Sequence, residues 1–273
     1  MPQLTALHLF PVKSCRGCAV AAAEVDNRGL VGDRRFLVVD GESRFLTQRV
    51  QPRMALIETA LADGRLVLSS PGHGAVRVPL RSPDPAARTA AVVIWRDTVT
   101  ADDCGDEPAA WLSAFLGFAC RLVRAGAAYS RPIPDRKVPA ALASAPAHEV
   151  TFADAFPFML LSEETLADLN GRLEAPLPMN RFRPNLVVAG AAPYAEDTWA
   201  RFRIGSVTFH GATRCARCAV TTTDQFTAGR GKEPLRTLAT YRRDAEDNIM
   251  FGRNLIHETK TGRLAVGDEV EFL

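Results

Sequence analysis

The sequence predicts an α+β fold in which short strands dominate, either a β-barrel or strongly curved sheets covered by a few helices. Three observations lead to this prediction. Apolar runs of strand length outnumber helical patterns along the 273-residue chain. These runs rarely alternate with helices, as they would in a doubly wound parallel sheet. Turn residues such as Gly, Pro and Asp-Gly separate them at short intervals.

The first half of the chain reads as a series of strands with one helix. The Asp63-Gly64 pair predicts a hairpin. Apolar residues at near-helical spacing predict a helix from Asp106 to Leu116 that ends at Gly117. The strands expected in this half cover residues 4–10, 19–25, 35–39, 54–60, 66–69, 76–80, 92–95 and 121–124.

Residues 126–147 have a different composition, because Ala and Pro dominate them. Such a stretch is typical of a connector between domains. We therefore expect two domains, residues 1–125 and residues 148–273, joined by this connector. A chain of 273 residues is long enough for two cores of ordinary size.

The second half continues the strand-rich pattern. Ser162 is a suitable N-cap for a helix over residues 163–173, with two glutamates in its first turn. Pro234 opens a second expected helix that runs to about Tyr241. The strands expected here cover residues 158–161, 186–189, 202–204, 206–210 and 219–223, followed by a strand-turn-strand unit over 264–273.

Charge and hydropathy exclude several classes of function. The net charge is +2, from 33 basic and 31 acidic residues, which is too balanced to indicate nucleic-acid binding. No apolar run approaches the ~20 residues of a membrane span. The N-terminus lacks the pattern of a secretory signal. We therefore expect a cytoplasmic protein without a membrane anchor.

Two CxxC pairs stand among the six cysteines, at Cys15/Cys18 and Cys215/Cys218. Disulfides are a poor default in a reducing compartment, so clustered cysteines favour metal binding or catalysis. The second pair is expected in a turn between two strands. Arg214 and Arg217 flank it, and positive charge favours the thiolate form that binds a soft metal.

Three other interpretations of this second pair stay open at the level of the residues. It is an inert turn, a half of a four-cysteine zinc site, or a redox pair. The distance in sequence between the two CxxC pairs is far larger than zinc sites usually show. A thioredoxin-like pair would lead into a helix, whereas this one is expected to lead into a strand. The three threonines at 221–223 could donate hydrogen bonds to an anion.

Basic and amide side chains follow several expected strands. Lys13 and Ser14 come directly after the first strand, Arg34 precedes another, and Arg183 and Asn185 precede a third. Taken one at a time, these residues are best explained as solvated charge at strand ends. Together with Arg217, they could form a pocket for a phosphate-bearing ligand, since Arg binds phosphate bidentately and Lys acts as a point charge.

From about residue 4 to the end, the chain resembles the MOSC family, most closely the mitochondrial amidoxime-reducing components and their bacterial relatives. Several separate motifs in the same order carry the resemblance. They are Leu9–Gly17, Gly32-Asp33-Arg34, Thr47-Gln48-Arg49, Leu161–Asn170, Phe182-Arg183-Pro184-Asn185, Tyr194–Trp199, Cys215–Asp224, Lys232–Leu235 and Val266-Gly267-Asp268.

The resemblance implies a fold, a cofactor and a set of ligands. The fold would be a MOSC β-barrel with covering helices, preceded by a strand-rich MOSC N-terminal domain. The cofactor would be molybdenum–molybdopterin, with Cys218 as the protein ligand of the metal and Asp154 as an acidic catalytic residue nearby. The residues implied in cofactor binding are Lys13, Ser14, Arg34, Asp154, Arg183, Asn185, Ala216, Arg217, Cys218 and Asn254.

The sequence departs from the family pattern at three of the positions near this set. Ala155 and Phe156 stand where relatives often have Thr and Ser, so two polar contacts to the cofactor are missing or replaced. Asn254 stands where the mitochondrial proteins have an aromatic residue. These departures bear on pterin binding and on substrate preference.

The function that the resemblance implies is reduction of N-hydroxylated compounds, such as hydroxylamines and amidoximes, by a molybdenum oxidoreductase. No four-cysteine cluster follows the last motif, so the electrons are expected from a separate partner: a ferredoxin, a cytochrome b5-like protein or a flavin reductase. The alternative is a carrier that binds molybdenum cofactor or sulfur without turnover. A structural zinc protein is a third possibility.

Overall fold

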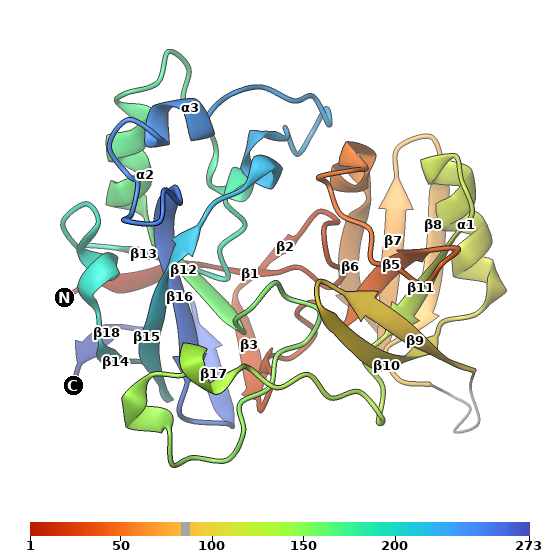
Figure 1. Ribbon diagram of the computed structural model, residues 1–273, viewed down its shortest axis with the longest axis horizontal. Coiled ribbons are helices and arrows are strands. Elements are labelled where there is room, and N and C mark those ends of the chain that lie inside the picture. The colour runs from red at the N-terminus through yellow and green to blue at the C-terminus, as the bar shows by residue number, and fades with distance from the viewer. Residues whose placement is uncertain (83–87) are drawn as a thin grey trace.

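The computed structural model describes residues 1–82 and 88–273, and strands dominate it as expected (Figure 1). The strands are β1 (Gln3–Leu9), β2 (Cys18–Val20), β3 (Ala22–Asp26), β4 (Gly29–Leu30), β5 (Phe36–Asp40), β6 (Glu58–Ala62), β7 (Arg65–Ser70), β8 (Gly74–Pro79), β9 (Thr89–Ile94), β10 (Asp97–Asp103), β11 (Cys120–Arg124), β12 (Phe158–Ser162), β13 (Leu186–Ala189), β14 (Arg201–Ile204), β15 (Val207–Ala216), β16 (Met250–His257), β17 (Gly262–Ala265) and β18 (Val270–Phe272). The α-helices are α1 (Asp106–Leu116), α2 (Glu163–Asn170) and α3 (Leu235–Leu238). Short 3-10 helices are η1 (Pro52–Leu56), η2 (Asp135–Lys137), η3 (Ala140–Leu142), η4 (Met179–Arg181), η5 (Ala195–Thr198) and η6 (Ala219–Thr222).

The largest sheet combines strands from both ends of the chain. Its order is β18-β14-β15-β16-β12-β13-β1-β2, in which β1 runs antiparallel to β13 and β12 runs parallel to it. A smaller sheet has the order β17-β3-β4. In Figure 1 the N-terminal strands, drawn in red, accordingly lie among the green and blue strands of the second half. We call β1–β4, β12–β18, α2 and α3 the large module.

The remaining strands form a second body, the small module, which consists of β5–β11 and α1. Its sheets have the orders β5-β11-β10-β9 and β6-β7-β8. Helix α1 packs against β11 and β8, and Gly117 ends it in the left-handed conformation at a φ of 87°. A division of the chain at residues 126–147 stays a prediction. What the structure shows is that β1–β4 pair with strands from beyond those residues.

Each module has its own buried core. Leu4, Leu7, Phe158, Phe202 and Phe209 belong to the core of the large module, behind its main sheet. In the small module, apolar residues of β5, β7, β8, α1 and β11 meet. The loop after β1 contributes to that second core although β1 itself lies in the large module, and it therefore ties the two modules together.

The structure corrects five expectations. Residues 19–25 are not one strand, because β2 ends at Val20 and β3 starts at Ala22 in another sheet. Residues 54–60 are not one strand, because η1 covers Pro52–Leu56 and β6 starts only at Glu58. The helix after Ser162 ends at Asn170, and the helix after Pro234 is a single turn. Residues 219–222 form the 3-10 helix η6 instead of the strand expected over residues 219–223. The CxxC pair at Cys215/Cys218 thus lies between a strand and a helical turn.

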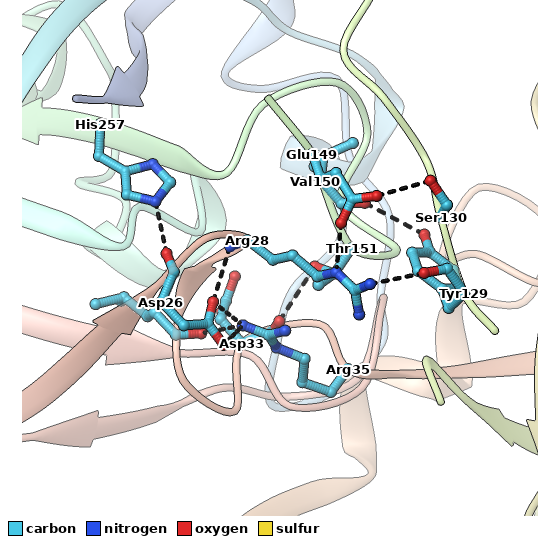
Figure 2. A network of polar contacts seen from close by, with 11 residues as sticks. Asp26, Arg28, Asp33, Arg35, Tyr129, Ser130, Glu149, Val150, Thr151 and His257 are labelled. Atoms are coloured by element: carbon cyan, nitrogen blue, oxygen red, sulfur yellow. Dashed lines mark hydrogen bonds and ion pairs between the residues drawn. The ribbon is translucent and has the colours of Figure 1, made fainter. Parts of the chain in front are cut away.

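A network of charged and polar residues connects the β3–β4 turn with the segments around it (Figure 2). Arg28 pairs with Glu149 at 2.8 Å and donates to the carbonyl oxygen of Tyr129 at 2.6 Å. Arg35 binds both carboxylate oxygens of Asp26. From β16, His257 Nε2 donates to the carbonyl oxygen of Asp26 at 2.7 Å. The network therefore links the β3–β4 turn to Arg35 before β5, to β16 and to the connector.

Within the described ranges, none of the helices has both the length and the apolar character that crossing a membrane requires.

Candidate functional site

A cavity of about 700 Å³ opens where the large and small modules meet. The loop after β1, the turn between β4 and β5, and the segment after β5 form one wall. The opposite wall comes from β12, β15, β16 and the loops beside them. Every residue predicted from the sequence to bind the cofactor or the metal lines this one cavity: Lys13, Ser14, Arg34, Asp154, Arg183, Asn185, Ala216, Arg217, Cys218 and Asn254.

Lys13 and Ser14 face the cavity because their neighbours are anchored elsewhere. Val12 and Cys15 are fully buried in the core of the small module. The Lys13 backbone nitrogen donates to the carbonyl oxygen of Phe36 at 2.9 Å, which fixes the loop to β5. With both flanks held in this way, the two polar side chains between them are directed away from that core.

Arg34, Arg183 and Asn185 form one cluster, although 151 residues separate Arg34 from Asn185. Arg34 Nη1 donates to Asn185 Oδ1 at 3.0 Å, and Arg183 Nη1 donates to the carbonyl oxygen of Cys15 at 2.7 Å. Both guanidinium groups lie over the ring of Phe10, at 4.6 and 4.3 Å from its centroid. The cluster is therefore rigid before any ligand binds.

Burial and repulsion by Arg34 both lower the pKa of Arg183. Burial lowers the pKa of Arg183 to about 9, and the nearby charge of Arg34 adds to this shift. The group still carries its charge at neutral pH. Two like charges held together in a buried position are costly unless an anion compensates for them. Asp33 already pairs with Arg34 at 2.6 Å, and the positive charge that remains on Arg183 favours an anion in the cavity.

Lys13 and Asp154 form an ion pair on the wall of the cavity. The Asp154 side chain is 56% exposed to the open space, whereas Lys13 is 7% exposed. Burial lowers the pKa of Lys13 to about 8, although the Asp154 carboxylate opposes this shift. For Asp154, burial disfavours the charge, but Lys13 and Arg49 outweigh that cost and hold its pKa below the usual range. Asp154 is therefore ionised at neutral pH.

The Cys215/Cys218 pair is positioned by an irregularity in the β15–β16 ladder. The register shifts between Arg214 and Ala216, which is the signature of a β-bulge. Bulges next to active sites redirect side chains. Cys218 follows as the residue that caps η6, and its carbonyl oxygen accepts from the backbone nitrogen of Thr221 at 3.1 Å. Both cysteines of the pair line the cavity.

The other four cysteines are poorer metal ligands, because a ligand must be a thiolate. Burial raises the pKa of Cys15 to about 12 and that of Cys104 to about 12. Burial also raises the pKa of Cys18 and of Cys120. Among residues 1–82 and 88–273, no group of three or more His, Cys, Asp or Glu is arranged to hold a metal ion. A four-cysteine zinc site has no geometric support there.

Two of the three threonines after the CxxC pair, Thr221 and Thr222, do not serve as anion donors in the way the sequence indicated, whereas the buried Thr223 hydroxyl has no hydrogen-bond partner within the described chain. The hydroxyl of Thr221 donates to the carbonyl oxygen of Cys218 at 2.9 Å, and that of Thr222 donates to Ala219 at 2.8 Å. Their protons therefore stabilise η6. The arginines also differ from expectation: Arg217 Nη1 bonds Cys215 Sγ at 3.0 Å, whereas Cys218 Sγ is bonded by Arg49.

The chemistry of the wall fits a phosphate-bearing pterin with a soft metal. Eight basic and three acidic side chains line the cavity, so its field favours an anion. The Nε atoms of Arg181 and Arg217 are buried, and neither has a hydrogen-bond partner within the described chain. Unpaired buried donors of this kind are rare and are usually satisfied by a ligand or by water. A soft thiol completes the donor set.

Several residues of the site were not among those predicted. Arg49 and Arg181 line the cavity, as do Arg214 and Lys137. Lys137 comes from the connector, and its Nζ lies 5.9 Å from the centroid of the Phe156 ring. A cation thus stands beside one of the positions where the family pattern expects a polar residue. Three of them carried a signal in the sequence: Arg181 belongs to the same basic segment as Arg183, Arg214 flanks the CxxC pair, and Arg49 belongs to the Thr47-Gln48-Arg49 motif.

Comparison with known proteins agrees with these features. The model of the MOSC N-terminal beta barrel domain matches residues 1–119, and that of the MOSC domain matches residues 147–271. The chain therefore belongs to the MOSC family. Mitochondrial amidoxime-reducing component 1 of Mus musculus is 35% identical over 98% of this chain and 81% of its own length. The human protein of that name is 34% identical over 98% and 82%. The molybdenum cofactor sulfurase of Danio rerio is 32% identical over 94% of this chain and 32% of its own length.

Proposed function

We propose that this protein binds molybdenum–molybdopterin in the cavity between its modules and reduces N-hydroxylated compounds, such as hydroxylamines and amidoximes. One observation carries the proposal. A cysteine thiol opens into a rigid, arginine-rich cavity, in a chain whose relatives include amidoxime-reducing components. When bound, the cofactor supplies two-electron redox chemistry at molybdenum. Overall, the N–OH compound takes up two electrons and two protons, the N–O bond breaks, and an amine or amidine and water leave.

In this proposal each predicted residue has a defined task. Cys218 provides the thiolate ligand of the metal. Arg183 and Arg217 provide charge for the phosphate, and Asn185 fixes Arg34 beside them. The other contacts to the cofactor come from Lys13, Ser14, Arg34, Ala216 and Asn254.

Asp154 is proposed as the proton relay. Because the carboxylate is ionised, it acts as a base that passes a proton on, and not as a stored acid. Lys13 Nζ donates a hydrogen bond to it and keeps it in the ionised form that can accept a proton. The open face of Asp154 is turned to the cavity where a substrate would lie.

The electrons come from a separate donor in this proposal: a ferredoxin, a cytochrome b5-like protein or a flavin reductase. The excess of arginine and lysine side chains that line the cavity favours a donor with an acidic face. We also propose that the protein acts in the cytoplasm.

The test is metal and pterin analysis of protein expressed in a host that makes the cofactor. We expect about one molybdenum per chain in the wild type, and loss of nearly all of it in Cys218→Ala. Cys215→Ala and the remote Cys104→Ala are matched controls that keep the metal. Molybdenum retained in Cys218→Ala would falsify the assignment of the ligand, and zinc without molybdenum in the wild type would refute the whole proposal.

A carrier that binds the cofactor without turnover is the second candidate, favoured by the match to a molybdenum cofactor sulfurase. Activity separates the two. A loaded wild-type protein that reduces benzamidoxime with a chemical reductant is an enzyme. A loaded protein that releases cofactor to an apo-acceptor, and reduces no N-hydroxylated compound, is a carrier.

A further inference from the structure

Arg49 is the one side chain of the small module that reaches the CxxC thiols among the contacts described. It belongs to the segment between β5 and η1. Its Nη2 donates to Cys218 Sγ at 3.0 Å and lies 3.5 Å from Asp154 Oδ2. The contact spans 169 residues and crosses from one module to the other. The thiol proposed as metal ligand is thus held by a residue from outside its own domain.

Two further contacts fix Arg49 in place. Its guanidinium carbon lies 4.7 Å from the centroid of the Trp95 ring, within range of a cation–π contact. Its backbone oxygen accepts from Arg230 Nη2 of the large module. The guanidinium group of Arg49 therefore lies over the Trp95 ring while its Nη2 contacts Cys218 and Asp154.

Trp95 has an unusual backbone for a bulky residue. It stands at the tip of the β9–β10 hairpin with a φ of 58°, and its side chain packs against Phe45 with ring centroids 5.0 Å apart. Positive φ in a bulky residue costs energy, and such strain persists where the surroundings demand it. A glycine or asparagine would suit this turn better. The contacts of the Trp95 ring with Arg49 and Phe45 therefore explain why tryptophan stands at this position.

We propose that Arg49, supported by Trp95, is a positioning residue for the Cys218 thiolate. This inference rests on the proposed function. An N–H···S hydrogen bond orients the sulfur toward the cavity and withdraws electron density from it. In metal–thiolate centres, hydrogen bonds to sulfur raise the reduction potential, because they stabilise the more negative, reduced state. Arg49 thereby makes the metal easier to reduce by the external donor.

Arg49→Gln and Arg49→Lys test this proposal, with Arg96→Ala as the matched control on the same hairpin. The readouts are molybdenum content and the midpoint potential of the metal. We expect Arg49→Gln to keep its fold and to lose about tenfold in the equilibrium constant of reduction, which is about 30 mV for a two-electron couple. Arg49→Lys keeps the charge and restores part of the shift. Arg96→Ala matches the wild type.

Trp95→Ala keeps the test decisive if Arg49→Gln loses its metal altogether. It removes the support but leaves the guanidinium, so we expect a shift of the same sign and smaller size, and Trp95→Phe should restore the wild-type value. A wild-type potential in Arg49→Gln would overturn the proposal, and so would a wild-type potential in Trp95→Ala if Arg49→Gln holds no metal. A wild-type protein without molybdenum would instead overturn the proposed function.

Discussion

Ser14, Arg34 and Arg183 share a backbone conformation that residues with side chains usually avoid. Their φ angles are 66°, 47° and 56°. Such conformations cost about 1–3 kcal/mol each and concentrate at functional sites, where the surrounding structure imposes them. Three of them around one cavity indicate that the loops are shaped by what they must bind, and not by local preference.

Gly32 explains how one of these loops can be built. Its φ is 91°, and a Cβ at this position would lie 2.4 Å from Leu61 Cδ1. The left-handed conformation favours glycine, and any larger residue would also displace the end of the Leu61 side chain. The turn then presents Asp33, which is buried and accepts from the Phe10 backbone nitrogen at 2.8 Å, and Arg34, which faces the cavity.

The pKa of Lys13 leads to a prediction about cofactor retention. Because Lys13 loses its proton as the pH rises through about 8, its attraction for a bound anion is complete below that pH and weakens above it. We expect the wild type to lose cofactor faster in dialysis at pH 9 than at pH 7, measured as molybdenum per chain.

Two variants show whether Lys13 is responsible. Lys13→Arg stays charged at both pH values, so its retention should be the same at pH 7 and pH 9. Lys13→Met should retain less molybdenum than the wild type at pH 7. Its retention should change little between pH 7 and pH 9. If the pH dependence of cofactor retention persists in Lys13→Met, another group causes it.

At the level of elements, local patterns predicted helix α1 and the exposed hairpin at Asp63-Gly64 best. Helix α1 begins and ends where its apolar spacing and Gly117 indicate. The Asp63-Gly64 turn has positive φ at both residues, as the hairpin signal implies. In these cases the information is contained within a few neighbouring residues, and the rest of the fold does not override it.

Strand β16 shows why other elements escaped prediction. It pairs with β12 and β15 at the centre of the main sheet, yet its sequence, Met250–His257, contains Gly252, Arg253 and Asn254. Polar residues at the centre of a strand conceal the alternation on which prediction depends. Of these three residues, Asn254 lines the cavity, so the functional site accounts for one of the residues that obscured the strand.

The site was predicted through the family pattern more than through physical signals. Local chemistry identified Cys215, Cys218 and several basic residues, but could not bring them together. Arg49 shows the limit most clearly. Its contact to Cys218 depends on how two modules pack, and no local feature of either segment contains that information.

Ser162 offers a test at this scale. It caps α2 by accepting from the Thr165 backbone nitrogen at 3.1 Å, and its hydroxyl donates to the buried Glu196 at 3.2 Å. Ser162→Ala removes both contacts, and we expect the free energy of unfolding to fall by about 2 kcal/mol. Thr198→Ala, at an exposed hydroxyl nearby, should stay within about 0.5 kcal/mol of the wild type. Urea unfolding measures both, and an equal effect of the two changes would contradict the capping role.

At the scale of the whole molecule, strands from both ends of the chain share the same sheets. The N-terminal strands β1–β4 complete sheets formed by the second half, and the two chain ends lie close together on one side of the large module (Figure 1). The loop after β1 then enters the small module. The cavity therefore exists only when both ends of the chain are in place, which couples the site to global stability.

His257 makes that stability depend on pH. It is 1% exposed, and it joins β16 to the β3–β4 turn through Asp26 (Figure 2). Burial lowers the pKa of His257 to about 4, the charge of Lys260 adds to the shift, and the bond to Asp26 opposes it. The unfolded chain, with a histidine pKa near 6.5, takes up the proton first as the pH falls.

The sign of the effect follows from this order of protonation. The contribution of His257 to stability is complete above pH 6.5 and is lost as the pH falls from 6.5 to about 4. At 1.36 kcal/mol per pKa unit, the loss is roughly 3 kcal/mol. His257→Gln keeps a donor for the Asp26 carbonyl but cannot take up a proton, so its free energy of unfolding should fall less steeply over this range. His73→Gln, in the small module, should retain the full wild-type slope. Urea unfolding at pH 7.5, 6, 5 and 4.5 measures the slopes, and equal slopes for the wild type and His257→Gln would exclude His257 as the group that links the stability of the assembled modules to pH.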